Sequence, residues 1–129
     1  MTKGNRIMSC ILIIEDDNNV RAVLQEMLQA AGYEVVHATN GKQGLRVYSE
    51  HSVDLVITDL LMPIMPGSRF ISILKDEFPN QKIIAMSGGG LRYQSDSYLE
   101  LASDLGAERI LKKPFLQTEL MNVVEEALA

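Results

Sequence analysis

The feature that most constrains the fold is a fivefold alternation between short apolar runs and longer stretches whose apolar residues have helical spacing. The first run, residues 10–14, is continuous and mostly β-branched, as expected of a parallel strand buried on both faces. The next stretch carries apolar residues three and four apart as far as Ala31. That spacing predicts an amphipathic helix, which Gly32 would end.

The same alternation predicts the other elements. Strands are expected at residues 33–38, 53–58, 82–86 and 108–112, and helices at 41–50, around Phe70 to Leu74, through Tyr98 to Leu105, and from Leu116 to Ala127. Strands alternating with helices imply a parallel sheet covered on both faces. Right-handed crossovers, together with a first strand apolar enough for the interior, favour the order 2-1-3-4-5. The predicted fold is therefore α/β, a doubly wound (βα)5 sandwich of the flavodoxin-like type.

Length, charge and cysteine content limit the classes of function. A chain of 129 residues makes one domain, which we place at residues 9–129 after an N-terminal extension, residues 1–8. The net charge of −5 argues against a dedicated nucleic-acid binder. The single cysteine, Cys10, allows no internal disulfide and suits a reducing cytosol. The apolar runs are too short to span a membrane, so we expect a cytoplasmic protein without direct nucleic-acid or membrane binding.

Polar side chains gather where the predicted strands end. Glu15 and Asp16 follow the first strand, Asp59 follows the third, Ser87 the fourth and Lys113 the fifth. Because ligands of such sheets bind beyond the carboxyl ends of the strands, these groups should converge. Crowded carboxylates repel one another unless a cation joins them, and hard oxygen ligands suit Mg²⁺. A metal there would make a phosphoryl group tolerable beside Asp59, whose carboxylate can act as the nucleophile.

Four segments in this order resemble the response-regulator receiver family of two-component signal transduction: ILIIEDDNNVR, DLVITDLLMPIMPG, IIAMSG and GAERILKKPF. The resemblance runs from Ile11 to about Leu128 and suggests a stand-alone, chemotaxis-regulator-like member. It implies a phosphorylation-dependent switch, a signalling phosphoacceptor and not an enzyme with a separate substrate. Asp59 would accept a phosphoryl group from a sensor histidine kinase or a phosphotransfer protein, with Mg²⁺, or Mn²⁺ in its place.

The resemblance also implies a role for each site residue. The metal ligands would be Asp16 directly, Glu15 mainly through water, Asp59, and Leu61 through its backbone carbonyl. Lys113 would pair with Asp59 or with the phosphate, and the bond from Lys113 to Pro114 would be cis, as is usual in the family. Ser87 would be the switch hydroxyl. Asp17 is expected to lie just outside the site as a helix N-cap or a bystander.

Two features depart from the family pattern and bear on the output. Ile110 stands where many receivers carry Tyr or Phe, so we expect Ser87 and Ile110 to signal through the glycine-rich loop of residues 87–94. Leu61 and Gly89 cannot orient an attacking water with their side chains, which predicts slow self-dephosphorylation. The output partner is unknown and would bind helix 4, strand 5 and helix 5 of a monomer or a phosphorylation-dependent dimer.

Several alternatives stay open from the sequence. The chain could be a receiver fragment of a larger response regulator or hybrid histidine kinase, or a pseudo-receiver that binds partners without being phosphorylated. A flavodoxin-like cofactor binder would share the fold, but the acidic segment EDDNN after the first strand repels a phosphate unless a metal is present. A haloacid-dehalogenase-type phosphatase needs a second Asp two residues after the nucleophile, where this chain has Leu61.

Overall fold

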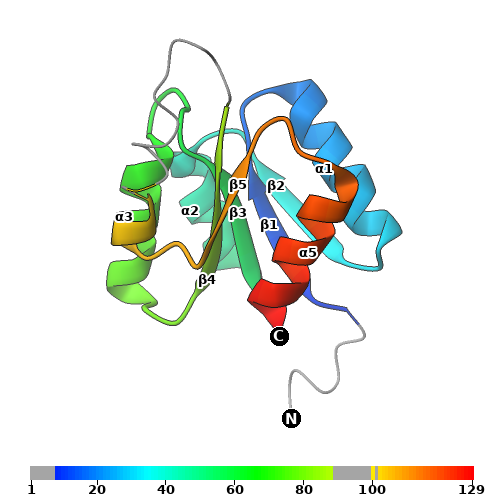
Figure 1. Cartoon of the computed structure of the whole chain (residues 1–129). Coiled ribbons are helices and arrows are strands. Elements are labelled where there is room, and N and C mark those ends of the chain that lie inside the picture. Colours follow the sequence, from blue (N-terminus) through cyan, green and yellow to red (C-terminus); the bar gives the residue numbers. More distant parts are fainter. Residues whose placement is uncertain (1–7, 89–99, 101) are drawn as a thin grey trace.

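The computed structural model describes residues 8–88, 100 and 102–129, and these form a five-stranded sheet between two layers of helices (Figure 1). All strand pairs are parallel. The strands are β1 (Cys10–Ile14), β2 (Glu34–Ala38), β3 (Leu55–Asp59), β4 (Lys82–Ser87) and β5 (Arg109–Lys112). Their order across the sheet is β2-β1-β3-β4-β5, which confirms the predicted fold and topology.

The helices cover both faces of the sheet. They are α1 (Asn18–Ala30), α2 (Gly41–Glu50), α3 (Gly67–Glu77) and α5 (Gln117–Leu128). Helices α1 and α5 lie on one face, and α2 and α3 lie on the other (Figure 1). Residues 102–105 are also helical, where a fourth helix was expected, whereas Tyr98 and Leu99 lie outside the described residues. None of the described helices combines the length and the apolar character needed to cross a bilayer.

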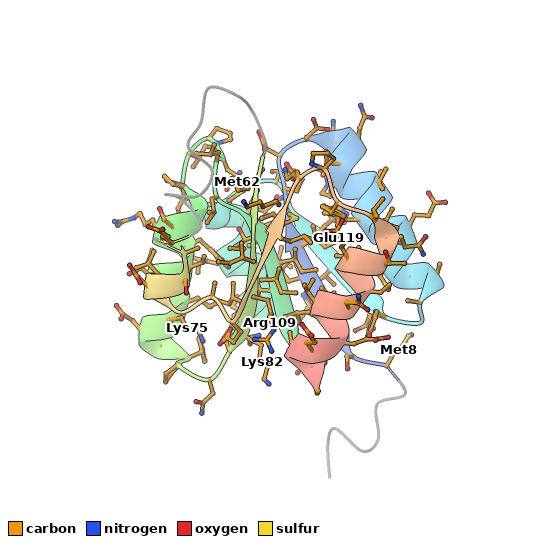
Figure 2. All side chains as sticks on the ribbon, in the orientation of Figure 1. Met8, Met62, Lys75, Lys82, Arg109 and Glu119 are labelled. Atoms are coloured by element: carbon orange, nitrogen blue, oxygen red, sulfur yellow. The ribbon has the colours of Figure 1, made fainter. Side chains whose placement is uncertain are left out.

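Each central strand sends alternate side chains into two apolar cores. Leu12 and Ile14 pack in one core with Phe70 of α3, whereas Ile11 and Ile13 pack in the other with residues of α1 and α5. All five residues of β1 are buried, which explains why the strand appears in the sequence as an unbroken apolar run. Figure 2 shows Lys82 and Arg109 at the end of the sheet where β4 and β5 begin. Met62, which follows β3, lies at the opposite end, where the strands finish.

The element boundaries agree closely with the predicted ones, with a shift at β3. Strand β1 and helix α2 have the expected bounds, and Gly32 follows α1 with a φ of 95°, a conformation that favours glycine. Strand β3 begins two residues later than predicted. Asp54, just before it, accepts a hydrogen bond from the backbone N–H of Cys10 at 2.8 Å. This buried carboxylate therefore anchors the start of β1, a role that the sequence analysis missed.

Candidate functional site

The predicted site residues meet at the carboxyl end of the sheet. Asp59 ends β3, and Glu15 directly follows β1, where it is 1% exposed. Lys113 follows β5, and its Nζ lies 2.6 Å from Glu15 Oε1 and 2.9 Å from Asp59 Oδ2. The expected pairing of Lys113 with Asp59 is present in the structure. The pairing of Lys113 with Glu15 was not predicted.

Three carboxylates form a cluster here, and two of them contact this ammonium group. One oxygen from each of Glu15, Asp16 and Asp59 lies within 4.8 Å of the others. Asp16 is exposed, and its carboxylate has no hydrogen-bond or ion-pair partner among the residues that the structure describes. Such a set of hard oxygen donors, one of them unengaged, fits Mg²⁺ in chemistry.

The loop after β3 is built tightly around Asp59. The backbone N–H of Leu61 donates to Asp59 Oδ1 at 3.2 Å, and the N–H of Gly67 donates to the carbonyl oxygen of Leu60 at 3.0 Å. A Cβ at Gly67 would lie 2.0 Å from the carbonyl oxygen of Asp59. Helix α3 can therefore begin this close to β3 because its first residue is glycine. The requirement for glycine at this position was not predicted; the only indication of it in the sequence is the pair Pro66–Gly67, which favours a turn.

Burial and charge shift the pKa values of two site residues. Burial raises the pKa of Glu15, and repulsion by Asp59 adds to this, although hydrogen bonds from Lys113 and from the N–H of Asp17 oppose it. Burial by itself would lower the pKa of Lys113. The hydrogen bond to Glu15 and the attraction of Asp59 outweigh burial, so the pKa of Lys113 is raised above its ordinary value. Lys113 is therefore a charged ammonium group at neutral pH.

Ser87 ends β4 with a hydroxyl that has no hydrogen-bond partner among the described residues. Its Oγ is buried and makes no hydrogen bond within the described part of the chain. A buried hydroxyl without a partner costs about 1–3 kcal/mol, and such a group calls for an explanation. One explanation is an oxygen-bearing ligand that arrives during function. The carbonyl oxygen of Ser87 accepts the N–H of Lys113 at 2.9 Å, so this hydroxyl belongs to the same site.

Ile110 lies on the same side of the sheet as Ser87. It pairs with Ala85 across β4 and β5 and packs, half-buried, against the core that contains Ala85 and Phe70. Because side chains alternate along a strand, Ser87, two residues after Ala85, faces the same side. The loop expected to respond comprises residues 87–94. The structure describes two of these residues, Ser87 and Gly88. The remainder, Gly89 included, lies outside the described residues.

Two further expectations around the site are confirmed. The bond between Lys113 and Pro114 is cis. Asp17 caps α1, because its Oδ1 accepts the backbone N–H groups of Asn19 and Val20 at 2.8 and 3.1 Å. Arg21 was missed: its Nη1 donates to the carbonyl oxygen of Glu15 at 2.9 Å and so anchors the end of β1. An arginine in the first turn of the helix after the acidic residues was the available indication.

Comparisons with known proteins agree with this geometry. The response regulator receiver domain model matches residues 11–125. The response regulator receiver protein CpdR of Brucella abortus is 33% identical over 124 residues, covering 94% of this chain and 98% of that protein. Chemotaxis protein CheY of Bacillus subtilis is 33% identical over 119 residues, with coverages of 92% and 96%.

A solved structure and two longer relatives complete the comparison. The crystal structure of a response regulator receiver domain protein from Clostridium thermocellum has a TM-score of 0.85 at 29% identity, and 94% of each chain is covered. The chain spans about half the length of two other curated relatives, both transcriptional regulators by name, from Cyanidium caldarium and Bacillus subtilis. The similarity therefore extends to proteins that contain more than this chain.

Proposed function

The chain belongs to the response regulator receiver domain family, whose match covers residues 11–125, and on that premise we propose that Asp59 is the residue through which it signals. Members of this family act in phosphorylation-dependent signalling, and so does this chain. The observation that carries the assignment of Asp59 is the ammonium group of Lys113, 2.9 Å from its carboxylate within the acidic cluster. A cation held there can offset the charge of an incoming phosphoryl group.

The proposed reaction needs positioning and charge neutralisation but no general base. A carboxylate oxygen of Asp59 forms a bond to phosphorus while the bond from phosphorus to the donor breaks, and the donor leaves with that electron pair. The ammonium group of Lys113 and the hydroxyl of Ser87 then bind phosphoryl oxygens. For Ser87 this supplies the partner that its buried Oγ lacks among the described residues.

Receiver domains bind Mg²⁺ at an acidic cluster, and the donor set here fits that ion. The proposed ligands are Asp16, Asp59, the backbone carbonyl of Leu61, and Glu15 through water, with Mn²⁺ able to substitute. When bound, the ion supplies positive charge that makes phosphoryl transfer to a carboxylate tolerable.

Intact-protein mass spectrometry tests the proposal and separates it from a pseudo-receiver that is never phosphorylated. We expect wild-type protein treated with Mg²⁺ and acetyl phosphate to gain the mass of one phosphoryl group, and D59A to gain none. An unchanged wild-type mass, or an equal gain on D59A, would overturn the assignment. Loss of the added mass over time also measures the proposed slow self-dephosphorylation, and a half-life of seconds would contradict it.

The partners are proposed by class. Receiver domains work with histidine kinases and output domains, so we assign a sensor kinase or phosphotransfer protein as the donor. Ser87 and Ile110 would change the surface formed by residues 102–105, β5 and α5, where the output partner binds. Because the chain spans about half of two relatives, an output domain within a longer protein is the second candidate beside a separate output protein.

A further inference from the structure

A hollow at the carboxyl end of the sheet lies beside the start of α2 and outside the acidic cluster. Its volume is about 370 Å³, and it is lined by Thr39, Asn40, Lys42, Gln43, Arg46 and Ile64. Ile64 belongs to the turn that follows β3, whereas the other lining residues precede α2 or lie in it. The hollow therefore joins two segments that are distant in the sequence, and none of its lining residues takes part in the proposed phosphoryl transfer.

Two cationic side chains at the hollow have no partner in the described part of the chain. Lys42 and Arg46 are exposed, and neither side chain forms an ion pair or a hydrogen bond with a described residue, Glu50 included. The two cations are four residues apart on α2, so they lie on one face of the helix, where like charges repel each other and weaken the helix. In a chain with a net charge of −5, this pair is a positive site that suits a negatively charged partner.

Ile64 adds an exposed apolar side chain to the same hollow. Its φ is 72° and it is 76% exposed. The turn is fixed in place, because the N–H of Met65 donates to the carbonyl oxygen of Pro63 and Met65 packs closely against Gly41, where a Cβ would lie 2.9 Å from the Met65 Sδ. An exposed apolar residue held in a strained conformation contributes little to the stability of the fold, and such strain is concentrated at functional sites.

We propose that this hollow is a docking surface for a protein partner, which binds it through a segment with two acidic side chains and an apolar one. The carboxylates pair with Lys42 and Arg46, whose Cβ atoms are about 5–6 Å apart at this helical spacing, and the apolar side chain packs against Ile64. The surface is separate from the one formed by residues 102–105, β5 and α5. It does not require phosphorylation of Asp59, so the inference goes beyond the proposed function.

A protein segment fits the hollow better than a nucleic acid does. A polyanion would meet the cations as well, but the net charge of −5 opposes its approach. Its phosphate backbone also offers no apolar group for Ile64. The combination of two cations with an apolar side chain therefore favours an acidic segment that is also apolar.

Random peptides of about a dozen residues, displayed in several copies on phage so that weak binders are retained, are the probe. They are selected on wild-type protein and, in parallel, on K42Q/R46Q and on the matched control K82Q/R109Q. The control removes two positive charges from the other end of the sheet, where Figure 2 shows Lys82 and Arg109. Circular dichroism first confirms that each variant is folded. The selections are made in EDTA without a phosphoryl donor, so their result does not depend on phosphorylation of Asp59.

We expect wild type and the control to enrich peptides with acidic and apolar residues about fivefold over K42Q/R46Q, since each exposed ion pair contributes modestly. A fluorescein-labelled synthetic copy of the most enriched peptide then gives dissociation constants by anisotropy. K42Q/R46Q and I64N should each bind this peptide about fivefold more weakly than wild type, and K82Q/R109Q within about twofold of it. Added NaCl should weaken binding to wild type more than binding to K42Q/R46Q.

Four results would overturn the inference. It fails if the peptides retained by wild type are no richer in acidic residues than those retained by K42Q/R46Q, or if I64N binds the selected peptide as tightly as wild type. It also fails if an oligothymidylate binds wild type more tightly than the peptide does, because the ligand is then a nucleic acid. Sedimentation showing self-association of wild type that K42Q/R46Q abolishes would assign the hollow to a second copy of this chain. A wild-type chain that gains no phosphoryl mass refutes the proposed function and leaves this inference standing.

Discussion

Replacing Ile64 with Asn should make the protein more stable. Ile64 has a φ of 72° and is 76% exposed. It is the centre of a three-residue turn, in which the N–H of Met65 donates to the carbonyl oxygen of Pro63 at 2.8 Å. A positive φ with this hydrogen bond is the rare and strained γ-turn. Such a conformation costs an L-residue roughly 1–3 kcal/mol, and a β-branched residue is a rare occupant of it. Asn is several-fold enriched among the non-glycine residues that adopt a positive φ.

The packing that the substitution removes is small. Full burial of an isoleucine side chain is worth about 1.5–3 kcal/mol, so the quarter of Ile64 that is covered contributes about 0.5 kcal/mol. Relief of the strain should exceed this loss, and we expect I64N to raise the free energy of unfolding by about 1 kcal/mol. With a typical dependence on urea, that gain raises the midpoint of unfolding by roughly 0.5 M.

Urea unfolding of the metal-free protein, followed by circular dichroism, measures this change. The matched control is V23N, because Val23 is an apolar residue that is 48% exposed within α1. There the substitution relieves no strain and leaves helix propensity nearly unchanged. It removes apolar surface that is about half covered, so V23N should be slightly less stable than wild type. An I64N variant less stable than wild type by about 0.5 kcal/mol or more would refute the reasoning.

Three further predictions concern the site. S87A should leave the unphosphorylated protein as stable as wild type, or up to about 1 kcal/mol more stable in urea, because it removes a buried hydroxyl that has no partner among the described residues. The phosphorylated form of S87A should lose its phosphoryl mass faster. G67A should lower the free energy of unfolding by at least about 2 kcal/mol and slow phosphorylation, because the new Cβ would displace Asp59. K113M should destabilise the metal-free protein by about 3 kcal/mol near neutral pH. Because the pKa of Lys113 is raised above 10.5, the advantage of wild type is fully present below about pH 10.5 and should be lost as the pH rises through the raised value.

The strands were predictable because their environment leaves a direct mark on the sequence. Strand β1 is buried on both faces, so every residue in it is apolar, and no amphipathic helix would have that pattern. The start of β3 was less clear, because Val53 continues the apolar character of the strand. The hydrogen bond from the N–H of Cys10 to the carboxylate of Asp54 marks this boundary. It joins residues that are 44 positions apart, so no local sequence pattern predicts it.

The convergence of the site residues was predictable for a topological reason. Parallel strands end at one edge of the sheet, so residues that follow different strands must lie close together there. The partner of Lys113 was not predictable, because its long stem can reach either Glu15 or Asp59 and in the structure contacts both. That Ser87 Oγ has no partner in the described part of the chain was not predictable for a similar reason, since hydrogen bonds depend on atomic positions that residue types do not fix.

The energy available to the switch can be weighed from these contacts. Reversing a two-state population from 1:99 to 99:1 requires about 5.5 kcal/mol. A hydrogen bond from Ser87 to a phosphoryl oxygen contributes at most about 3 kcal/mol, even when the acceptor is charged. With Ile110 in place of an aromatic residue, rearrangement of an aromatic ring at that position contributes nothing. The remainder, about 2.5 kcal/mol or more, has to come from the other groups at the site, among them Lys113, whose ammonium group can exchange its contact with Asp59 for one with the phosphoryl group. S87A should therefore weaken the response, and so should loss of Lys113.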